Sequence, residues 1–270
     1  MSAANRTRPP ARTLEVLRTA ELSPSMRRIT VGGEELAGFR DQHTGPNIKV
    51  FVPRPEQSRP VLPVLDPATG RYRWPEPHER PTMRTYSVRR YDEERGELDI
   101  DFVLHGDHGV ASSWARDARP GDLLGVMGPG GRTCRESDWY LLVGDETALP
   151  AIAAIVEQLP VTARGQVFVE VADAAEQQHL VCPPDLRLTW LHRDGVPAGS
   201  STLLADAVRA VDVPSGASAW VAGESSMVRG IRRHLRDERR LDAASVLAVG
   251  YWKHGMAEPD YHDKHNHDRD

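Results

Sequence analysis

Hydrophobic and polar residues follow two different patterns in the two halves of the chain. Before about residue 130, short runs alternate apolar and polar positions between Gly, Pro or Asp, which is typical of half-buried β-strands. Six runs are predicted as strands: TLEVLRT, MRRITVG, NIKVFVP, RTYSVRRY, ELDIDFVLH and DLLGVMG. Six short strands at this spacing favour a small antiparallel barrel. One helix, in GVASSWARDA, is expected to interrupt them.

The second half alternates strands with helices, which indicates a doubly wound parallel sheet. The apolar run WYLLVG leads into a helix in DETALPAIAAIVEQL, and further strands and helices follow up to SVLAVGYW. In the first helix Ile152 and Ile155 share one face, and Pro150 occupies a first-turn position where proline is tolerated. We therefore predict a six-stranded antiparallel β-barrel at residues 14–130 followed by an α/β domain at 138–256.

Three segments fit neither pattern. Residues 53–83 contain eight prolines and no predicted element, and a connection of that length in a compact domain is usually functional or disordered. Residues 1–13 and 257–270 are expected to be disordered tails, because polar segments cannot offset the entropy of ordering. The second tail carries three histidines, so a weak metal site there stays open.

Composition narrows the class of protein. A formal net charge of −5 argues against a nucleic-acid binder, which usually carries a basic surplus. No apolar run approaches the roughly 18 residues that would cross a bilayer, and the first residues lack the apolar region of a signal peptide. The two cysteines, Cys134 and Cys182, fit no metal spacing and are expected to be reduced thiols. We expect a cytoplasmic monomer with neither a membrane nor a nucleic-acid partner.

Five motifs follow one another along the chain: MRTYSVRRYD, DIDFVLHGDHGVASSWA, GDETALPA, WVAGESSMVRGIRRHL and GYWKHG. An Arg-x-Tyr-Ser strand, a Gly-led short helix and then a βαβ domain resemble the ferredoxin-reductase-like flavoenzymes. Within that group the five motifs, between about residues 14 and 256, resemble the siderophore-interacting proteins, which are flavin-dependent ferric-siderophore reductases. The resemblance implies FAD and NAD(P)H as cofactors and a ferric-siderophore as substrate.

The run from Arg84 to Ser87 is the first candidate for FAD. A guanidinium such as Arg84 can bind a pyrophosphate through forked hydrogen bonds. Tyr86 lies two residues on and shares its strand face, where a phenol can pack on the isoalloxazine ring, whereas Ser87 faces the other way. An edge strand with solvated side chains would show the same pattern. The resemblance implies that the whole run, Thr85 included, binds FAD.

The second phosphate candidate is the helix start in HGVASSW. Gly109 permits close approach of the backbone, and Ala111 and Ser112 would expose free amides at the helix N-terminus, which favours an anion. An ordinary serine N-cap would look alike. His105 ends the preceding strand and either approaches the cofactor or is structural.

The resemblance assigns two turns of the second half to NAD(P)H. Their candidate residues are Asp145, Thr147, Ala148, Gly223, Glu224 and Ser225. Asp145 and Glu146 are unusual beside a pyrophosphate because like charges repel. We expect these two carboxylates to face away or to meet the nicotinamide amide, and Thr147 to be the best donor. Glu224 and Ser225 also suit a helix start with an acidic first turn.

The choice between NADH and NADPH stays open. A free ribose 2′-hydroxyl suits Asp or Glu, and a 2′-phosphate calls for Arg or Lys. Asp173 and Glu176 follow the second predicted strand of the sheet without a base, which favours NADH. Arg193 follows the neighbouring strand and is the candidate base for a 2′-phosphate, and siderophore-interacting proteins are commonly NADPH-dependent.

The expected substrate site uses cations. Lys253 ends the last strand of the parallel sheet, at the edge where such sheets bind ligands. The resemblance implies a basic patch for the ferric-siderophore, for which Arg239, Arg240 and, with lower weight, Lys49 are further candidates. Arg239 and Arg240 equally suit a solvated helix end.

The function expected on this basis is electron transfer from NAD(P)H through FAD to siderophore-bound Fe(III), which leaves as Fe(II) in the cytosol. No acid–base residue is required, because the cofactor carries the redox chemistry. One alternative is a general flavin reductase or an electron-transfer subunit of the same fold, although four-cysteine cluster spacing is absent. Another is a siderophore-binding protein without redox turnover.

Overall fold

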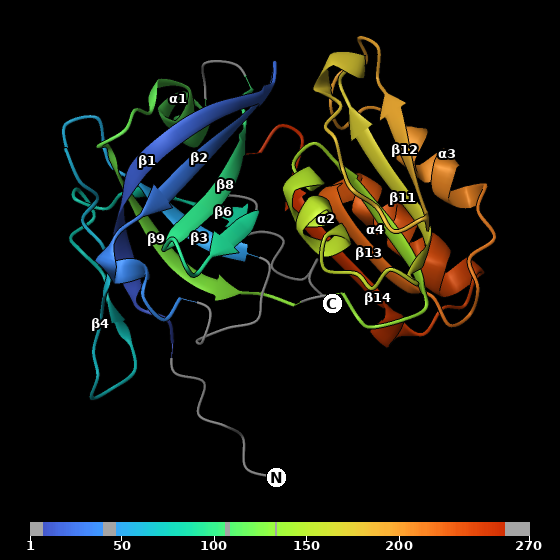
Figure 1. Ribbon diagram of the computed structural model, residues 1–270, viewed down its shortest axis with the longest axis horizontal. Coiled ribbons are helices and arrows are strands. Elements are labelled where there is room, and N and C mark those ends of the chain that lie inside the picture. The colour runs from blue at the N-terminus through green and yellow to red at the C-terminus, as the bar shows by residue number, and fades with distance from the viewer. Residues whose placement is uncertain (1–7, 40–46, 106–108, 133, 257–270) are drawn as a thin grey trace. The chain divides into compact units, whose positions relative to one another are not determined.

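The computed structural model describes residues 8–39, 47–105, 109–132 and 134–256. The chain divides into two compact units, one up to residue 133 and one from residue 134 onwards (Figure 1). In the described residues no helix is long and apolar enough to cross a membrane. The same residues contain no group of three His, Cys, Asp or Glu that could hold a metal, and the histidine-bearing tail lies outside them.

Among the described residues of the first unit, seven strands form an antiparallel sheet in the order β6-β3-β9-β1-β2-β8-β7. Their bounds are β1 (Ala11–Ser23), β2 (Met26–Gly32), β3 (Asn47–Val52), β6 (Thr82–Ser87), β7 (Arg90–Asp92), β8 (Glu97–Val103) and β9 (Leu123–Gly130). A short turn, η1 (Glu34–Leu36), and the helix α1 (Val110–Asp117) complete the unit. Helix α1 packs against β2, β3, β6 and β8.

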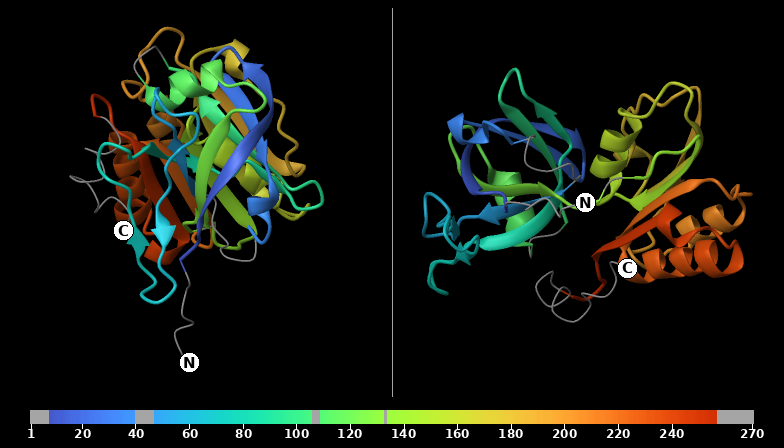
Figure 2. Two further views of the ribbon diagram at one scale, coloured as in Figure 1. Left: turned by 90° about the vertical axis from the view of Figure 1, so that its left-hand side faces the viewer. Right: turned by 90° about the horizontal axis from the view of Figure 1, so that it is seen from below.

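The sheet curls back on itself around one apolar core. Tyr86 on the edge strand β6 and Phe102 on β8, near the opposite edge, have ring centroids 4.3 Å apart. Alternate residues such as Leu14 and Ile100 are fully buried in this core, because successive side chains of a strand point to opposite faces. The curled sheet is the blue and green part of Figure 2.

The predicted number of six strands falls one short of this sheet. The run RTYSVRRY contributes both β6 and β7, because the chain leaves the first partner at Val88 and joins another. Tyr86 pairs with Ile48 of β3, whereas Tyr91 pairs with Leu98 of β8. One uninterrupted strand cannot pair with two strands that lie near opposite edges of the sheet.

The proline-rich segment holds a small hairpin and covers the outer face of the sheet. Strands β4 (Val64–Leu65) and β5 (Tyr72–Arg73) pair with each other. The Leu62 side chain lies so close to β9 that a β-carbon on Gly125 would be 2.4 Å from its Cδ2 atom. Phe51, on the outer face of β3, is fully buried and lies 6.2 Å from the Trp74 ring, centroid to centroid. The segment therefore shields apolar surface.

The second unit is built on a parallel sheet, as predicted. Its described residues form five strands in the order β12-β11-β10-β13-β14. The strands are β10 (Trp139–Asp145), β11 (Arg164–Val171), β12 (Asp185–His192), β13 (Ser218–Glu224) and β14 (Val246–Trp252). The helices are α2 (Leu149–Val156), α3 (Leu203–Arg209) and α4 (Ser225–Arg233), with short turns η3 (Ala174–Glu176), η4 (His234–Glu238) and η5 (Ala243–Ser245).

The strand order of the second unit reverses beside β10. The chain proceeds outward from β10 through β11 to β12 and then returns to β13 on the other side of β10. Helix α2 covers one face of the sheet, and α3 and α4 cover the other (Figure 2). Such a reversal opens a ligand crevice at the carboxyl ends of the strands, and this edge carries most of the buried polar groups described next.

Candidate cofactor and substrate site

The start of α1 is shaped for an anion. Gly109 is its N-cap residue, and in the described residues no side chain caps this helix end. A β-carbon on Gly109 would lie 2.7 Å from the Cε1 atom of His105, so a larger residue there would require the imidazole to move. The buried Ser112 hydroxyl accepts a hydrogen bond of 3.1 Å from the His105 amide and so ties the helix to the segment that follows β8. Among the described residues, the amides of the first turn therefore have no side-chain cap, which is the arrangement that favours an anion at a helix N-terminus.

Arg84 and Tyr86 share the face of β6 that α1 packs against. Their cross-strand neighbours on β3 are the core residues Val50 and Ile48, and paired residues of neighbouring strands project to the same face. The Arg84 guanidinium donates a 2.8 Å hydrogen bond to the Met83 carbonyl. Arg84 and Tyr86 are both half-buried.

Thr85 and Ser87 occupy the other face of β6. The Lys49 ammonium donates a hydrogen bond to the Thr85 hydroxyl from the directly opposite position on β3. Ser87 is buried opposite Asn47. Lys49 therefore belongs to the neighbourhood of the Arg-x-Tyr-Ser strand.

A contact that the sequence did not indicate fixes the other end of α1. The Arg27 guanidinium of β2 donates hydrogen bonds to the carbonyls of Arg116 and Ala118, the second at 3.2 Å. It also donates to the Thr19 hydroxyl at 2.9 Å. A cation at a helix C-terminus stabilises the helix dipole, so Arg27 helps to hold α1 in place.

These features fit FAD. A pyrophosphate requires amides and a cation, which the start of α1 and Arg84 supply on one face of the sheet. The Tyr86 ring, braced by Phe102 at 4.3 Å, offers a surface for an aromatic ring system.

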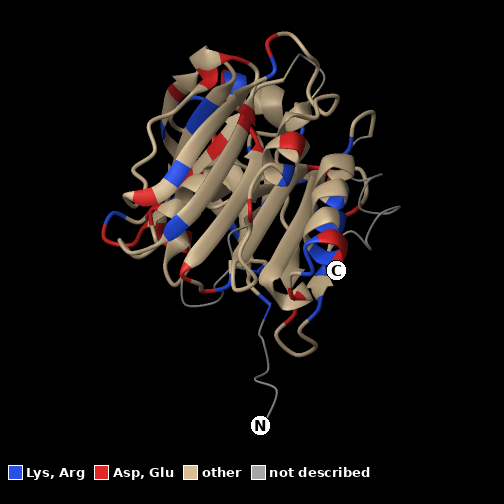
Figure 3. Ribbon diagram, turned by 90° about the vertical axis from the view of Figure 1, so that its right-hand side faces the viewer, with Lys and Arg blue, Asp and Glu red and all other residues tan. Residues whose placement is uncertain are grey.

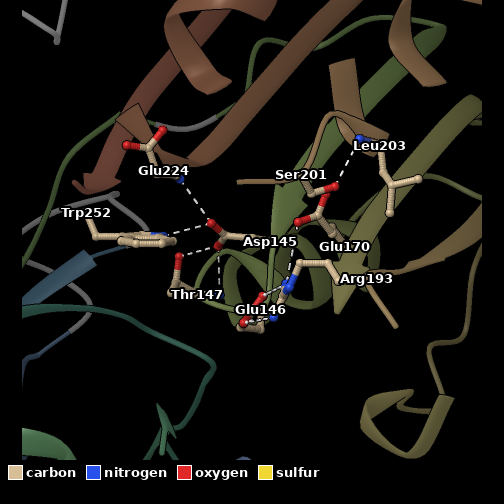
Figure 4. Close-up of polar contacts among 9 residues, drawn as sticks. All are labelled: Asp145, Glu146, Thr147, Glu170, Arg193, Ser201, Leu203, Glu224 and Trp252. Atoms are coloured by element: carbon tan, nitrogen blue, oxygen red, sulfur yellow. Dashed lines mark hydrogen bonds and ion pairs between the residues drawn. The ribbon is translucent and has the colours of Figure 1, made fainter. Parts of the chain in front are cut away.

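Asp145 joins three strands at the carboxyl edge of the second unit (Figure 4). It ends β10 and is 5 % exposed. Its Oδ1 atom accepts the amide and the hydroxyl of Thr147. Its Oδ2 atom accepts the Glu224 amide at 3.0 Å and the Trp252 indole N–H at 2.8 Å. The side chain therefore faces the protein, and both donors of Thr147 are used within the turn.

Burial dominates the electrostatics of Asp145. It raises the pKa of this carboxyl to about 6, and the negative charge of Glu146 adds to the rise. The four donors oppose the shift, since hydrogen bonds to the charged form favour it. Ala148, predicted at the nucleotide turn, is fully buried and donates its amide to the Asp145 carbonyl at 3.0 Å.

Glu146 forms a forked ion pair with Arg193. The two Nη atoms of Arg193 donate to the two oxygens of Glu146, each at 2.7 Å, and Nη1 lies 3.5 Å from Glu170. The Arg193 side chain is only 5 % exposed. Burial lowers its pKa, but the nearby carboxylates outweigh that effect, so the pKa stands above its ordinary value. The guanidinium is thus already occupied by carboxylates.

The start of α4 holds Glu224, Ser225 and Lys253 together. Glu224 caps the helix by accepting the amides of Ser226 and Met227. The Lys253 ammonium lies 3.6 Å from the Glu224 carboxylate and donates to the Ser226 hydroxyl. Glu224 and Ser225 are buried, whereas the Lys253 side chain keeps 23 % exposure. Lys253 therefore stands at the predicted edge with part of its charge balanced by Glu224.

Arg239 and Arg240 lie at the opposite edge of the sheet from Lys253. Helix α4 begins after β13, at the carboxyl edge, and leads back to the start of β14. Its last turn is basic, and the turn η4 that follows it carries charges of both signs (Figure 3). Arg239 donates to the carbonyls of Arg209 and Val211 at 3.2 and 3.1 Å and so caps α3. The structure does not bring these arginines together with Lys253.

The acidic pair predicted at the ribose position is also tied into the fold. Asp173 accepts the Ala175 amide at 2.8 Å and begins the turn η3. Glu176 is buried within that turn. Both follow β11 at the carboxyl edge of the sheet.

The two units together define a class of protein. A curled antiparallel sheet with a helix, followed by a five-stranded parallel sheet covered by helices, is the fold of ferredoxin reductases. The structure of ferredoxin–NADP+ reductase from Plasmodium falciparum shares this fold, with a TM-score of 0.64 at 10 % identity over 88 % of this chain and 95 % of that one.

Sequence comparison places the chain within that class. Residues 15–133 match the family model of the siderophore-interacting FAD-binding domain, and residues 137–255 match the siderophore-interacting protein model. The chain belongs to the siderophore-interacting protein family, and its first unit is the family's FAD-binding domain.

Several relatives cover nearly the whole chain. Ferric vibriobactin reductase ViuB of Vibrio cholerae is 38 % identical over 94 % of this chain and 93 % of its own length. The NADPH-dependent ferric-chelate reductase of Escherichia coli is 35 % identical over 89 % of this chain and 92 % of its own. The crystal structure of a siderophore utilization protein from T. fusca has a TM-score of 0.84 at 39 % identity, over 93 % of this chain and 96 % of that one.

Proposed function

We propose that this protein is an FAD-dependent reductase that transfers electrons from a nicotinamide nucleotide to Fe(III) held by a siderophore, and so releases Fe(II) in the cytoplasm. One observation carries the proposal: a single chain combines an FAD-binding unit with a nucleotide-type parallel sheet and shares more than a third of its residues with a ferric vibriobactin reductase along nearly its full length.

The first unit would hold FAD. The amides at the start of α1 and the Arg84 guanidinium bind the pyrophosphate, and Tyr86 packs on the isoalloxazine ring. Arg27 holds α1 in position by donating hydrogen bonds to carbonyls at its C-terminal end. When bound, FAD would supply the conversion of a two-electron donor into one-electron steps, which suits a metal ion that accepts one electron.

The second unit would bind the nicotinamide nucleotide at the carboxyl edge of its sheet. Asp145 fixes the turn after β10 and the start of α4 by accepting donors from both. The nucleotide then lies against these turns, at Thr147 and Ala148 on one side and from Gly223 to Ser225 on the other. The amides of Thr147, Ala148 and Glu224 are already bonded to Asp145, so they fix the backbone of the turns and are not themselves donors to the nucleotide. Side chains already bonded within the turns orient this backbone.

Lys253 would attract the substrate. Ferric catecholates carry net negative charge, and the Lys253 ammonium retains partial exposure beside Glu224. Lys49 remains a further candidate cation on the first unit. Arg239 and Arg240 are left out of this site because they lie at the other edge of the sheet.

Iron release requires no acid–base residue of the protein. Siderophore oxygens are charged or strongly polar ligands, so lowering the charge of the iron from +3 to +2 weakens its attraction to them. The chain contributes binding and orientation. Reduced iron is then free to pass to a stronger ferrous ligand.

The proposal is tested with the full chain saturated with FAD. NADH and a ferric tris-catecholate are added without oxygen, and a ferrous-specific chelator reports the iron released. Coloured ferrous complex should form only when protein, FAD and nucleotide are all present. Flavin reduction without any ferrous complex would instead support a general flavin reductase, and binding of the ferric complex without flavin reduction would support a carrier.

A further inference from the structure

Arg193 is placed where a cation would recognise a ribose 2′-phosphate. It directly follows β12, and its amide donates to the Val171 carbonyl at the end of β11 with a 3.0 Å hydrogen bond. In dinucleotide-binding sheets the residues that distinguish the 2′-hydroxyl from the 2′-phosphate lie at the end of the second strand, which is β11 here. The side chain thus has the right type and place for NADPH.

The positive charge of the Arg193 guanidinium is, however, already balanced by carboxylates. The Glu146 carboxylate accepts hydrogen bonds from both Nη atoms of Arg193 at 2.7 Å. The Glu170 carboxylate, which is 5 % exposed, lies 3.5 Å from Nη1. Figure 4 shows the guanidinium turned towards these carboxylates. The Nε atom is buried and has no hydrogen-bond partner among the described residues. A buried ion pair with an unpartnered donor is weak evidence for stability. A contribution to stability therefore does not explain why the pair is present, and a role in ligand binding explains it better.

The net negative charge around the Arg193–Glu146 ion pair disfavours a ribose 2′-phosphate. One cation, Arg193, stands against the two carboxylates of Glu146 and Glu170, and Asp173 follows at the end of β11. A 2′-phosphate would add further negative charge to a place that is already negative. At low effective dielectric constant such repulsion is strong, whereas a neutral 2′-hydroxyl avoids it.

We propose that Glu146 determines the nucleotide specificity of the site by occupying Arg193, so that the protein takes NADH in preference to NADPH. This inference rests on the proposed function, because it requires a nicotinamide nucleotide at the carboxyl edge of the sheet. Glu146 is a specificity-determining residue that acts through Arg193. It takes no part in the electron transfer.

The test uses two fragments that carry no redox group, 5′-ADP and 2′,5′-ADP, titrated calorimetrically against the FAD-loaded protein. The natural protein should bind 5′-ADP at least about tenfold more tightly than 2′,5′-ADP. Glu146→Gln removes the carboxylate and frees the guanidinium, so it should bring the two affinities within about threefold of each other. Glu136→Gln removes the same charge from an exposed residue before β10, at the opposite edge, and should leave the preference unchanged.

The double variant Glu146→Gln with Arg193→Gln replaces the ion pair by two neutral amides and keeps the test decisive if the single variant fails to fold. It should keep the preference for 5′-ADP, because the gain in the single variant needs Arg193. Thermal unfolding of each variant reports whether it is folded.

Three results would overturn the inference. One is a natural protein that prefers 2′,5′-ADP. Another is a Glu146→Gln variant that changes both affinities equally, which would make the pair merely structural. The third is binding of neither fragment, combined with no flavin reduction by NADH or NADPH, which would overturn the proposed function as well.

Discussion

The carboxylate of Asp145 occupies the space that a side chain on Gly223 would need. A β-carbon on Gly223 would lie 2.6 Å from the Oδ2 atom of Asp145, and the φ angle of Gly223 is +137°. Side chains other than glycine rarely adopt that conformation. The close approach lets Oδ2 reach the Glu224 amide at 3.0 Å. Glycine at the end of β13 is thus a condition for joining the two turns of the proposed nucleotide site.

Gly223→Ala is expected to destabilise the second unit by more than about 1 kcal/mol, because it combines backbone strain with a steric clash. It should weaken binding of 5′-ADP and leave bound FAD in the first unit. Gly230→Ala is the matched control, since a β-carbon there meets nothing within 4 Å and alanine favours a helix interior by up to about 1 kcal/mol. Chemical unfolding of both variants measures the difference. Equal stability of the two variants would contradict this account of Gly223.

The raised pKa of Asp145, about 6, predicts a pH dependence of stability. A carboxyl whose pKa is higher in the folded state than in the unfolded state contributes stability that is complete only below the unfolded value of about 3.9 and is lost as pH rises through about 6. Asp145→Asn removes this titration. The free energy of unfolding of the natural protein, relative to that of the variant, should therefore be higher at pH 4.5 than at pH 7.5, by about 2 kcal/mol.

Urea unfolding of both proteins across this pH range provides the measurement. A difference that stays constant, or that grows as pH rises, would show that the four hydrogen bonds hold the pKa of Asp145 at or below its ordinary value.

Arg84 and Tyr86 are expected to differ in their effect on FAD. Arg84→Ala removes a charge-assisted contact to phosphate, which corresponds to about 1.5–3 kcal/mol of binding free energy. Tyr86→Phe keeps the ring that packs on Phe102 and removes only a hydroxyl. Fluorescence titration of the flavin-free protein with FAD gives both dissociation constants. A larger loss for Tyr86→Phe would place the pyrophosphate away from Arg84.

The sequence predicted the order of strands and helices because burial follows their periodicity. The alternation of β1 and the apolar runs of β10 and β13 carry that signal directly. The division between β6 and β7 was not predicted, since it depends on which distant strand each segment joins. Pairing of Arg193 with Glu146, 47 residues apart, likewise arises only when the strand ends meet. Position along the chain identified these residues as candidates, but their partners are set by tertiary structure.

Lys253→Ala should raise the KM for an anionic ferric catecholate by about twofold to fivefold, in keeping with about 0.5–1 kcal/mol for a partly exposed charge beside a carboxylate. Flavin reduction by NADH should change little. Arg240→Ala, at the other edge of the sheet, is the control and should leave KM unchanged. The effect should shrink with added salt, because screening acts within about 10 Å at 0.1 M. If a neutral ferric hydroxamate responds as strongly, Lys253 does not act through its charge.

Anaerobic mixing of the fully reduced, FAD-loaded protein with an excess of ferric tris-catecholate tests the central claim most directly. Photochemical reduction beforehand removes the nucleotide from the experiment, so only the transfer to iron is observed. A ferrous-specific chelator is present to report Fe(II). The flavin absorbance should return as the coloured ferrous–chelator complex forms. Two Fe(II) should appear for each FAD, because reduced FAD carries two electrons and each Fe(III) accepts one. A flavin that stays reduced in the presence of the ferric complex, and regains its absorbance only when oxygen is admitted, would contradict the assignment as a ferric-siderophore reductase.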